Sequence, residues 1–121
     1  MRTEMVEAQI RTEMTRVSTL IGALMEHYTG ENPVEVPGAD EDHFSMFGYA
    51  EDTFTKIIRW VDKPDMEVDV GDLLNCCIEL KTYCRILDHQ AGLTYFDRPA
   101  AIGLAAHLVE GLIKTFDETF S

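Results

Sequence analysis

Apolar residues recur every three or four positions in four separate stretches of this chain, and this spacing constrains the fold more than any other feature. It places the apolar side chains of each stretch on one face of a helix. The third stretch is the most regular, with intervals of four, three, four and three between Leu73, Cys77, Leu80, Cys84 and Leu87. The spacing predicts an all-α fold.

The other three stretches show the same spacing less regularly. Their apolar residues are Val6, Ile10, Met14, Val17, Leu20 or Ile21, Leu24 and Tyr28; Phe44, Phe47, Phe54, Ile57, Ile58 and Val61; and Ile102, Ala105, Val109, Leu112, Phe116 and Phe120. Gly30, Pro64 and Gly92 are expected to end helices, Gly48 to bend the second, and Pro99 to open the last. We predict one domain over residues 1–121, a bundle of four to five helices.

Two acidic connectors separate these stretches. Residues 31–39 contain two prolines and cannot be helical throughout. Residues 65–69 alternate acidic and apolar side chains, but the chain offers no partner strand, so we predict a loop. Asp69 is predicted to cap the third helix.

Negative charge is concentrated in the middle third of the chain. The net charge is −12, and residues 31–72 hold 12 acidic against 3 basic side chains, an excess of 9. Such a concentration attracts cationic partners and repels phosphate backbones. The predicted contact residues for a basic protein surface are Glu31, Glu35, Asp40, Glu41, Asp42, Glu51, Asp52, Asp62, Asp65 and Glu67.

The same composition excludes several classes of function. Direct binding to nucleic acid or to an anionic membrane depends on Lys and Arg, which number only 10 against 22 acidic residues. No apolar run approaches the length of a membrane span and no leader is evident, so we expect a cytoplasmic protein, in the cell that makes it or in a host.

The expected function is therefore non-catalytic. An acidic helical protein could dock on the Arg and Lys side chains with which a nucleic-acid-binding protein grips phosphates, and so inhibit it. By analogy with small acidic inhibitors carried by phages, the target could be a defence nuclease. This expectation requires the middle third to display its carboxylates as one anionic surface.

A structural or regulatory protein that acts through a helix face is the main alternative. Gly103, His107 and Gly111 lie four residues apart on one helical stripe with little side-chain bulk. Glycine within a helix costs up to about 1 kcal/mol, which close approach of another helix would offset. That helix could belong to the same chain or to a second copy in a homodimer.

Catalysis and metal binding have weaker support. Cys77 and Cys84 lie within the apolar pattern of the third helix, whereas Cys76 is placed to be more exposed, so a small enzyme would use Cys76 or a histidine. The acids at positions 65, 67 and 69 do not match a calcium loop, because the glycine and the twelfth residue fall out of register. We expect no cofactor and no metal.

Overall fold

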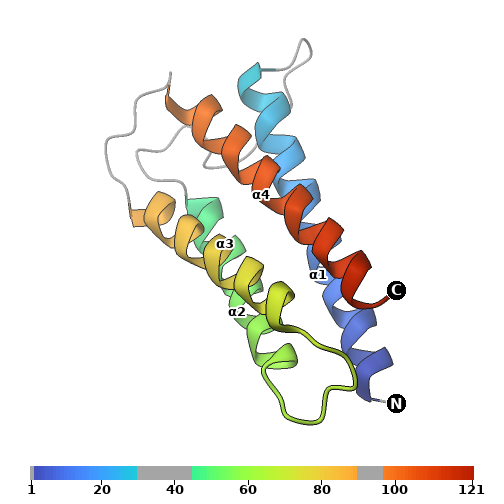
Figure 1. Ribbon diagram of the computed structural model, residues 1–121. Helices are drawn as coiled ribbons and strands as arrows, with labels where there is room; N and C mark the ends of the chain where they lie inside the picture. The colour runs from blue at the N-terminus through green and yellow to red at the C-terminus, as the bar shows by residue number, and fades with distance from the viewer. Residues whose placement is uncertain (1, 30–44, 90–96) are drawn as a thin grey trace.

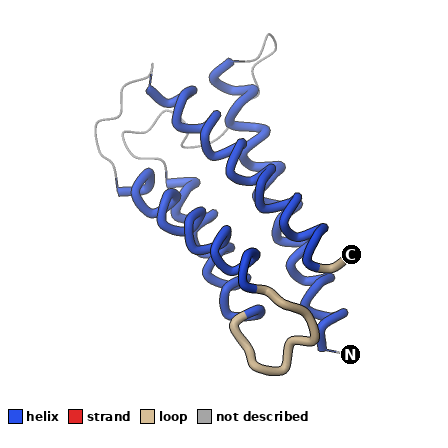
Figure 2. Tube along the Cα trace, viewed as in Figure 1, coloured by secondary structure: helices blue, strands red, loops and turns tan. Residues whose placement is uncertain are grey.

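The computed structural model describes residues 2–29, 45–89 and 97–121, which form four helices and contain no strand. The helices are α1 (Arg2–Thr29), α2 (Ser45–Val61), α3 (Gly71–His89) and α4 (Asp97–Thr119). Each packs on its neighbours in chain order and α4 closes the ring on α1, with successive helices running in opposite directions (Figures 1 and 2). The predicted all-α bundle is confirmed.

The core is built from the predicted apolar faces. All five residues of the regular α3 pattern are buried, with 5% exposure at most. In α1 the alternative between Leu20 and Ile21 is resolved, because Ile21 is 3% exposed while Leu20 lies at the edge of the core. The described apolar residues predicted for α2 and α4 are buried or pack against the core; Gly30, Phe44, Gly92 and the 31–39 connector lie outside the described residues.

Gly48 lies within α2, close to α3. The helix continues from Ser45 to Val61 without interruption. A Cβ atom at Gly48 would lie 2.9 Å from Oδ2 of Asp88, so the absence of a side chain there lets α3 bring its carboxylate close to α2. The glycine therefore permits close packing of α3 against α2.

The connector between α2 and α3 is a loop, as predicted, and it is attached at two points. The backbone N–H of Glu67 donates to Oγ1 of the buried Thr3, 3.2 Å away, which fastens the connector to the start of α1. The N–H of Gly71 donates to Oδ1 of Asp69 at 2.9 Å, which confirms that Asp69 caps α3. The connector therefore lies at the end of the bundle that also holds both chain termini (Figure 1).

Candidate interaction surfaces

The connector directs its acidic side chains outward by alternation. Asp65, Glu67 and Asp69 are exposed, whereas the intervening Met66 and Val68 are half-buried. Exposed and half-buried side chains thus alternate as they would in a strand, although the backbone forms turns and bends. Met66 and Val70 pack against the core, so the acidic side chains of the segment face solvent.

One further carboxylate comes from the far end of the sequence. A hollow of about 150 Å³ lies between the start of α3 and the last turns of α4, and its lining comprises Asp69, Asp72, Thr115, Glu118 and Thr119. We call the exposed carboxylates of residues 62–72, together with Glu118 at this hollow, the acidic end; its members are Asp62, Asp65, Glu67, Asp69, Asp72 and Glu118. Sequence reasoning missed Glu118, because only the fold brings α4 beside the connector.

Local helix stability explains only part of the acidic end. Asp69 and Asp72 lie at the N-terminus of α3, where negative charge interacts favourably with the helix dipole. Glu118 lies at the C-terminal end of α4, where negative charge is unfavourable, and the last turn of α4 contains no basic residue. The placement of Glu118 therefore does not serve the stability of its own helix.

The acids predicted on α2 lie elsewhere. Glu51 is half-buried against α3, where its charge helps to raise the pKa of Cys84. Asp52, the next residue, is exposed on the opposite side, beside Lys56 and Arg59. Neither belongs to the acidic end, and Glu31, Glu35, Asp40, Glu41 and Asp42 lie outside the described residues. Of the predicted contact residues that the structure describes, Asp62, Asp65 and Glu67 belong to the acidic end, whereas Glu51 and Asp52 do not.

The outer face of α2 is a second polar surface. Tyr49 is 61% exposed, and a hollow of about 270 Å³ lies beside it, lined by Tyr49, Asp52, Thr53, Thr55, Lys56 and Arg59. The sequence places Asp52 and Lys56 four residues apart, where an ion pair is expected. No such pair forms, since the ion pairs between described residues join Arg11 to Glu7 and Arg16 to Glu13.

The glycine stripe of α4 makes no close internal contact. A Cβ atom added at Gly103 or Gly111 would meet no atom of the described chain within 4 Å apart from the adjoining backbone of α4 itself, and His107 is exposed. The expected approach of another helix of the same chain to these glycines is therefore absent. Next to this stripe, a groove between α1 and α4 contains two adjoining hollows of about 270 and 200 Å³, which share Ser18 and Ile113.

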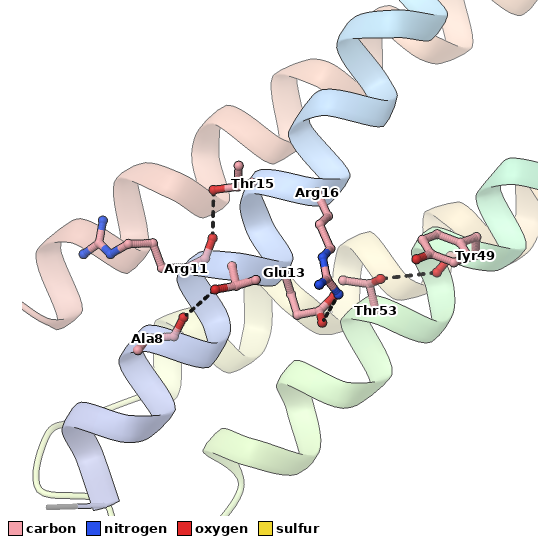
Figure 3. Close-up of polar contacts among 8 residues, drawn as sticks. Ala8, Arg11, Glu13, Thr15, Arg16, Tyr49 and Thr53 are labelled. Carbon is pink, nitrogen blue, oxygen red and sulfur yellow. Dashed lines mark hydrogen bonds and ion pairs between the residues drawn. The ribbon is translucent and has the colours of Figure 1, made fainter.

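Two buried charges were not predicted. Glu13 is 8% exposed on the side of α1 that faces α2, and its Oε1 accepts a hydrogen bond from Nη1 of Arg16 at 3.1 Å (Figure 3). Arg98, in the first turn of α4, is 6% exposed. Glu13 directly precedes Met14, which belongs to the apolar pattern of α1. Glu13 is buried because α2 covers that side of α1, and the spacing of apolar residues does not reveal how far a neighbouring helix extends around α1.

The cysteines occupy the predicted positions. Cys77 and Cys84 are fully buried, and burial raises the pKa of each thiol to about 12, so both remain protonated near neutral pH. Cys76 is half-buried, and its Sγ donates to Oγ1 of Thr115 at 3.6 Å. The ring of His27 lies edge-on to that of Tyr28, with centroids 4.8 Å apart.

Other features bear on metal and membrane binding. Among residues 2–29, 45–89 and 97–121, no three His, Cys, Asp or Glu side chains are arranged to hold a metal ion. None of the described helices combines the length and apolar content needed to cross a bilayer. Comparisons of the chain with protein-family models, with curated proteins and with solved structures find no match.

Proposed function

We propose that this protein is a non-catalytic helical module that binds a positively charged protein surface through its acidic end. The observation that carries the proposal is a run of five exposed carboxylates in one segment, residues 62–72, of which Asp69 and Asp72 line a hollow together with Glu118 from α4. Residues 62–72 contain a single basic side chain, Lys63, against those five acids. Clustered charge of one sign steers an oppositely charged partner during encounter.

The attachment of the connector favours recognition over simple solvation. The hydrogen bond from Glu67 to Thr3 holds the backbone in the middle of the carboxylate series and the bond from Gly71 to Asp69 holds it near the start of α3, so less conformational entropy is lost on binding. Arg and Lys side chains that contact nucleic-acid phosphates are suitable partners, because carboxylates offer them the same charge-assisted hydrogen bonds. The protein would then inhibit a nucleic-acid-binding protein, such as a defence nuclease, by occupying its phosphate site.

The test is capture of a partner from host lysate by the immobilised protein at low and high salt. The variant D62N/E67Q/E118Q should lose the partner, while the matched variant E26Q/E79Q/E110Q, which removes three exposed charges elsewhere, should retain it. Binding should weaken with added salt, and competing duplex DNA should release the partner. Equal loss from both variants, or capture that is unchanged at high salt, would show that the acidic end is not the contact.

The α1–α4 groove supports a second candidate, a structural or regulatory protein that binds an apolar helix. Its lining includes the apolar residues Met14, Ile21 and Ile113 among polar ones, and a Cβ atom at the exposed Gly22 would have open space around it. A partner held there would remain bound at high salt, because burial of apolar surface does not depend on ion pairing. Replacing Gly22 by Leu would fill the groove and release such a partner, whereas D62N/E67Q/E118Q would not.

A further inference from the structure

The outer face of α2 carries polar side chains that find no partner within the described chain. Asp52, Lys56 and Arg59 are exposed and form none of the ion pairs that the structure contains. Tyr49, on the same face, exposes 61% of its surface. Inward, the helix is fully packed, because Phe47, Ala50, Phe54, Ile57 and Val61 are at most 1% exposed. This face is accordingly available for contact with another molecule.

The side chains along this face would complement those of a second copy of α2 that runs in the opposite direction. In an antiparallel pair of α2 helices related by a twofold axis level with residue 54, positions whose numbers sum to 108 lie opposite each other. Asp52 of one copy then faces Lys56 of the other, and Tyr49 faces Arg59. Each pairing occurs twice, as an ion pair and as a cation on an aromatic ring.

We propose that the outer face of α2 is the contact surface of a symmetric homodimer. Twofold dimers join the same patch of both subunits, which is the arrangement that this self-complementary order requires. The hollow of about 270 Å³ beside Tyr49 provides room for side chains of the second copy.

The electrostatics of the whole molecule also favour this face. Two molecules that each carry a net charge of −12 repel one another at long range. The three basic residues of the acidic middle third, Lys56, Arg59 and Lys63, all lie at this face or directly after it. Two copies that meet along α2 therefore bring basic as well as acidic side chains to the contact.

The dimer goes beyond the proposed function and would alter its consequences. In an antiparallel pair centred on residue 54, Asp62 of one copy lies about 24 Å along the helix direction from Asp62 of the other, given a rise of ~1.5 Å per residue. The two acidic ends then point in opposite directions. A dimer would bind two basic partner molecules, or two sites on an elongated one.

The decisive experiment is charge reversal followed by charge exchange, with the dimerisation constant measured by sedimentation equilibrium from about 10 µM to 1 mM. D52K and K56D should each weaken association by about tenfold, because each sets like charges opposite one another twice. The exchanged variant D52K/K56D should return to within about threefold of the wild type, because the opposite charges face each other again. All these positions are exposed, and circular dichroism would verify the helical content.

Net charge provides an internal control. D52K changes the net charge from −12 to −10 and so reduces general repulsion, yet dimerisation should weaken. E110K makes the same change of charge on the exposed face of α4 and should not weaken dimerisation. A wild-type protein that is monomeric throughout this range, a D52K variant that dimerises normally, or a loss caused by E110K would overturn the proposal.

The same variants separate this proposal from the proposed function. D52K and D52K/K56D leave every residue of the acidic end unchanged, so capture of a basic partner at low salt should persist in both. Conversely, D62N/E67Q/E118Q should lose the partner while retaining the dimerisation constant. Failure of one proposal therefore leaves the other intact.

Discussion

Helix α2 and the connector that follows it arrange their acidic residues in different ways. Glu51 and Asp52 are adjacent in sequence, yet one lies against α3 and the other faces solvent, because successive residues of a helix point about 100° apart. Asp65, Glu67 and Asp69 are separated in sequence, yet all three are exposed, because Met66 and Val70 of the same loop pack against the core and leave the acidic side chains in solvent. Acidic residues that are close in sequence therefore form one acidic surface only where the backbone directs their side chains to the same side.

The largest expected effect of a single substitution tests the two faces of α2. Phe54 is fully buried, and Phe54→Ala should lower the free energy of unfolding by about 3 to 5 kcal/mol through lost burial and a residual cavity. Tyr49→Ala, five residues earlier on the exposed face, should change it by less than about 0.5 kcal/mol. Urea unfolding followed by circular dichroism measures both.

A variant that does not fold would leave this comparison unmeasured, so a milder change is needed alongside. Phe54→Leu should cost about 1 kcal/mol and keep the protein folded. If Tyr49→Ala were as destabilising as Phe54→Ala, the assignment of the two faces would be wrong.

The next effect concerns alkaline pH. Burial raises the pKa of Cys77 and of Cys84 from 9.0 to about 12. Below pH 9 both thiols are protonated in the folded and unfolded chains. Between about pH 9 and 12 the unfolded chain releases protons that the folded chain retains, so stability should fall by about 1.4 kcal/mol per pH unit for each thiol.

Urea unfolding at several pH values between 8 and 11 measures this slope. The variant C77A/C84A should show a much shallower decline, whatever its stability at neutral pH. Parallel declines in the two proteins would mean that the thiols are accessible in the folded state.

A smaller effect tests the attachment of the connector. Thr3→Val removes the acceptor of the hydrogen bond from the N–H of Glu67 while conserving side-chain volume, and should cost about 1 kcal/mol. The amide of Glu67 should exchange its hydrogen faster. Thr3→Ser retains the hydroxyl and should keep that amide protected; equal exchange in all three proteins would show that this bond does not hold the connector.

The smallest effect distinguishes the two adjacent acids of α2. The negative charge of Glu51 contributes, after burial, to the raised pKa of Cys84, so Glu51→Gln should lower that pKa. Asp52→Asn should leave it unchanged, because Asp52 lies on the outer face. The Cβ chemical shift of Cys84 followed by NMR across the alkaline range reports both, and an equal response to the two substitutions would contradict the placement of Glu51.

The helices and their buried faces could be predicted from the sequence because they depend on local periodicity. Apolar residues three and four apart must share a side of any helix they form, and burial of that side drives folding. The regular α3 pattern, the cap at Asp69 and the loop at 65–69 follow from neighbouring residues alone.

The candidate surfaces depended on tertiary structure. Glu118 meets Asp69 and Asp72 only because antiparallel packing brings the end of α4 beside the start of α3. Glu51 leaves the predicted anionic surface because α3 covers that side of α2, and Glu13 is buried where α2 covers α1. A sequence determines the direction of each side chain around its own helix, but which neighbour stands in that direction depends on how the helices pack.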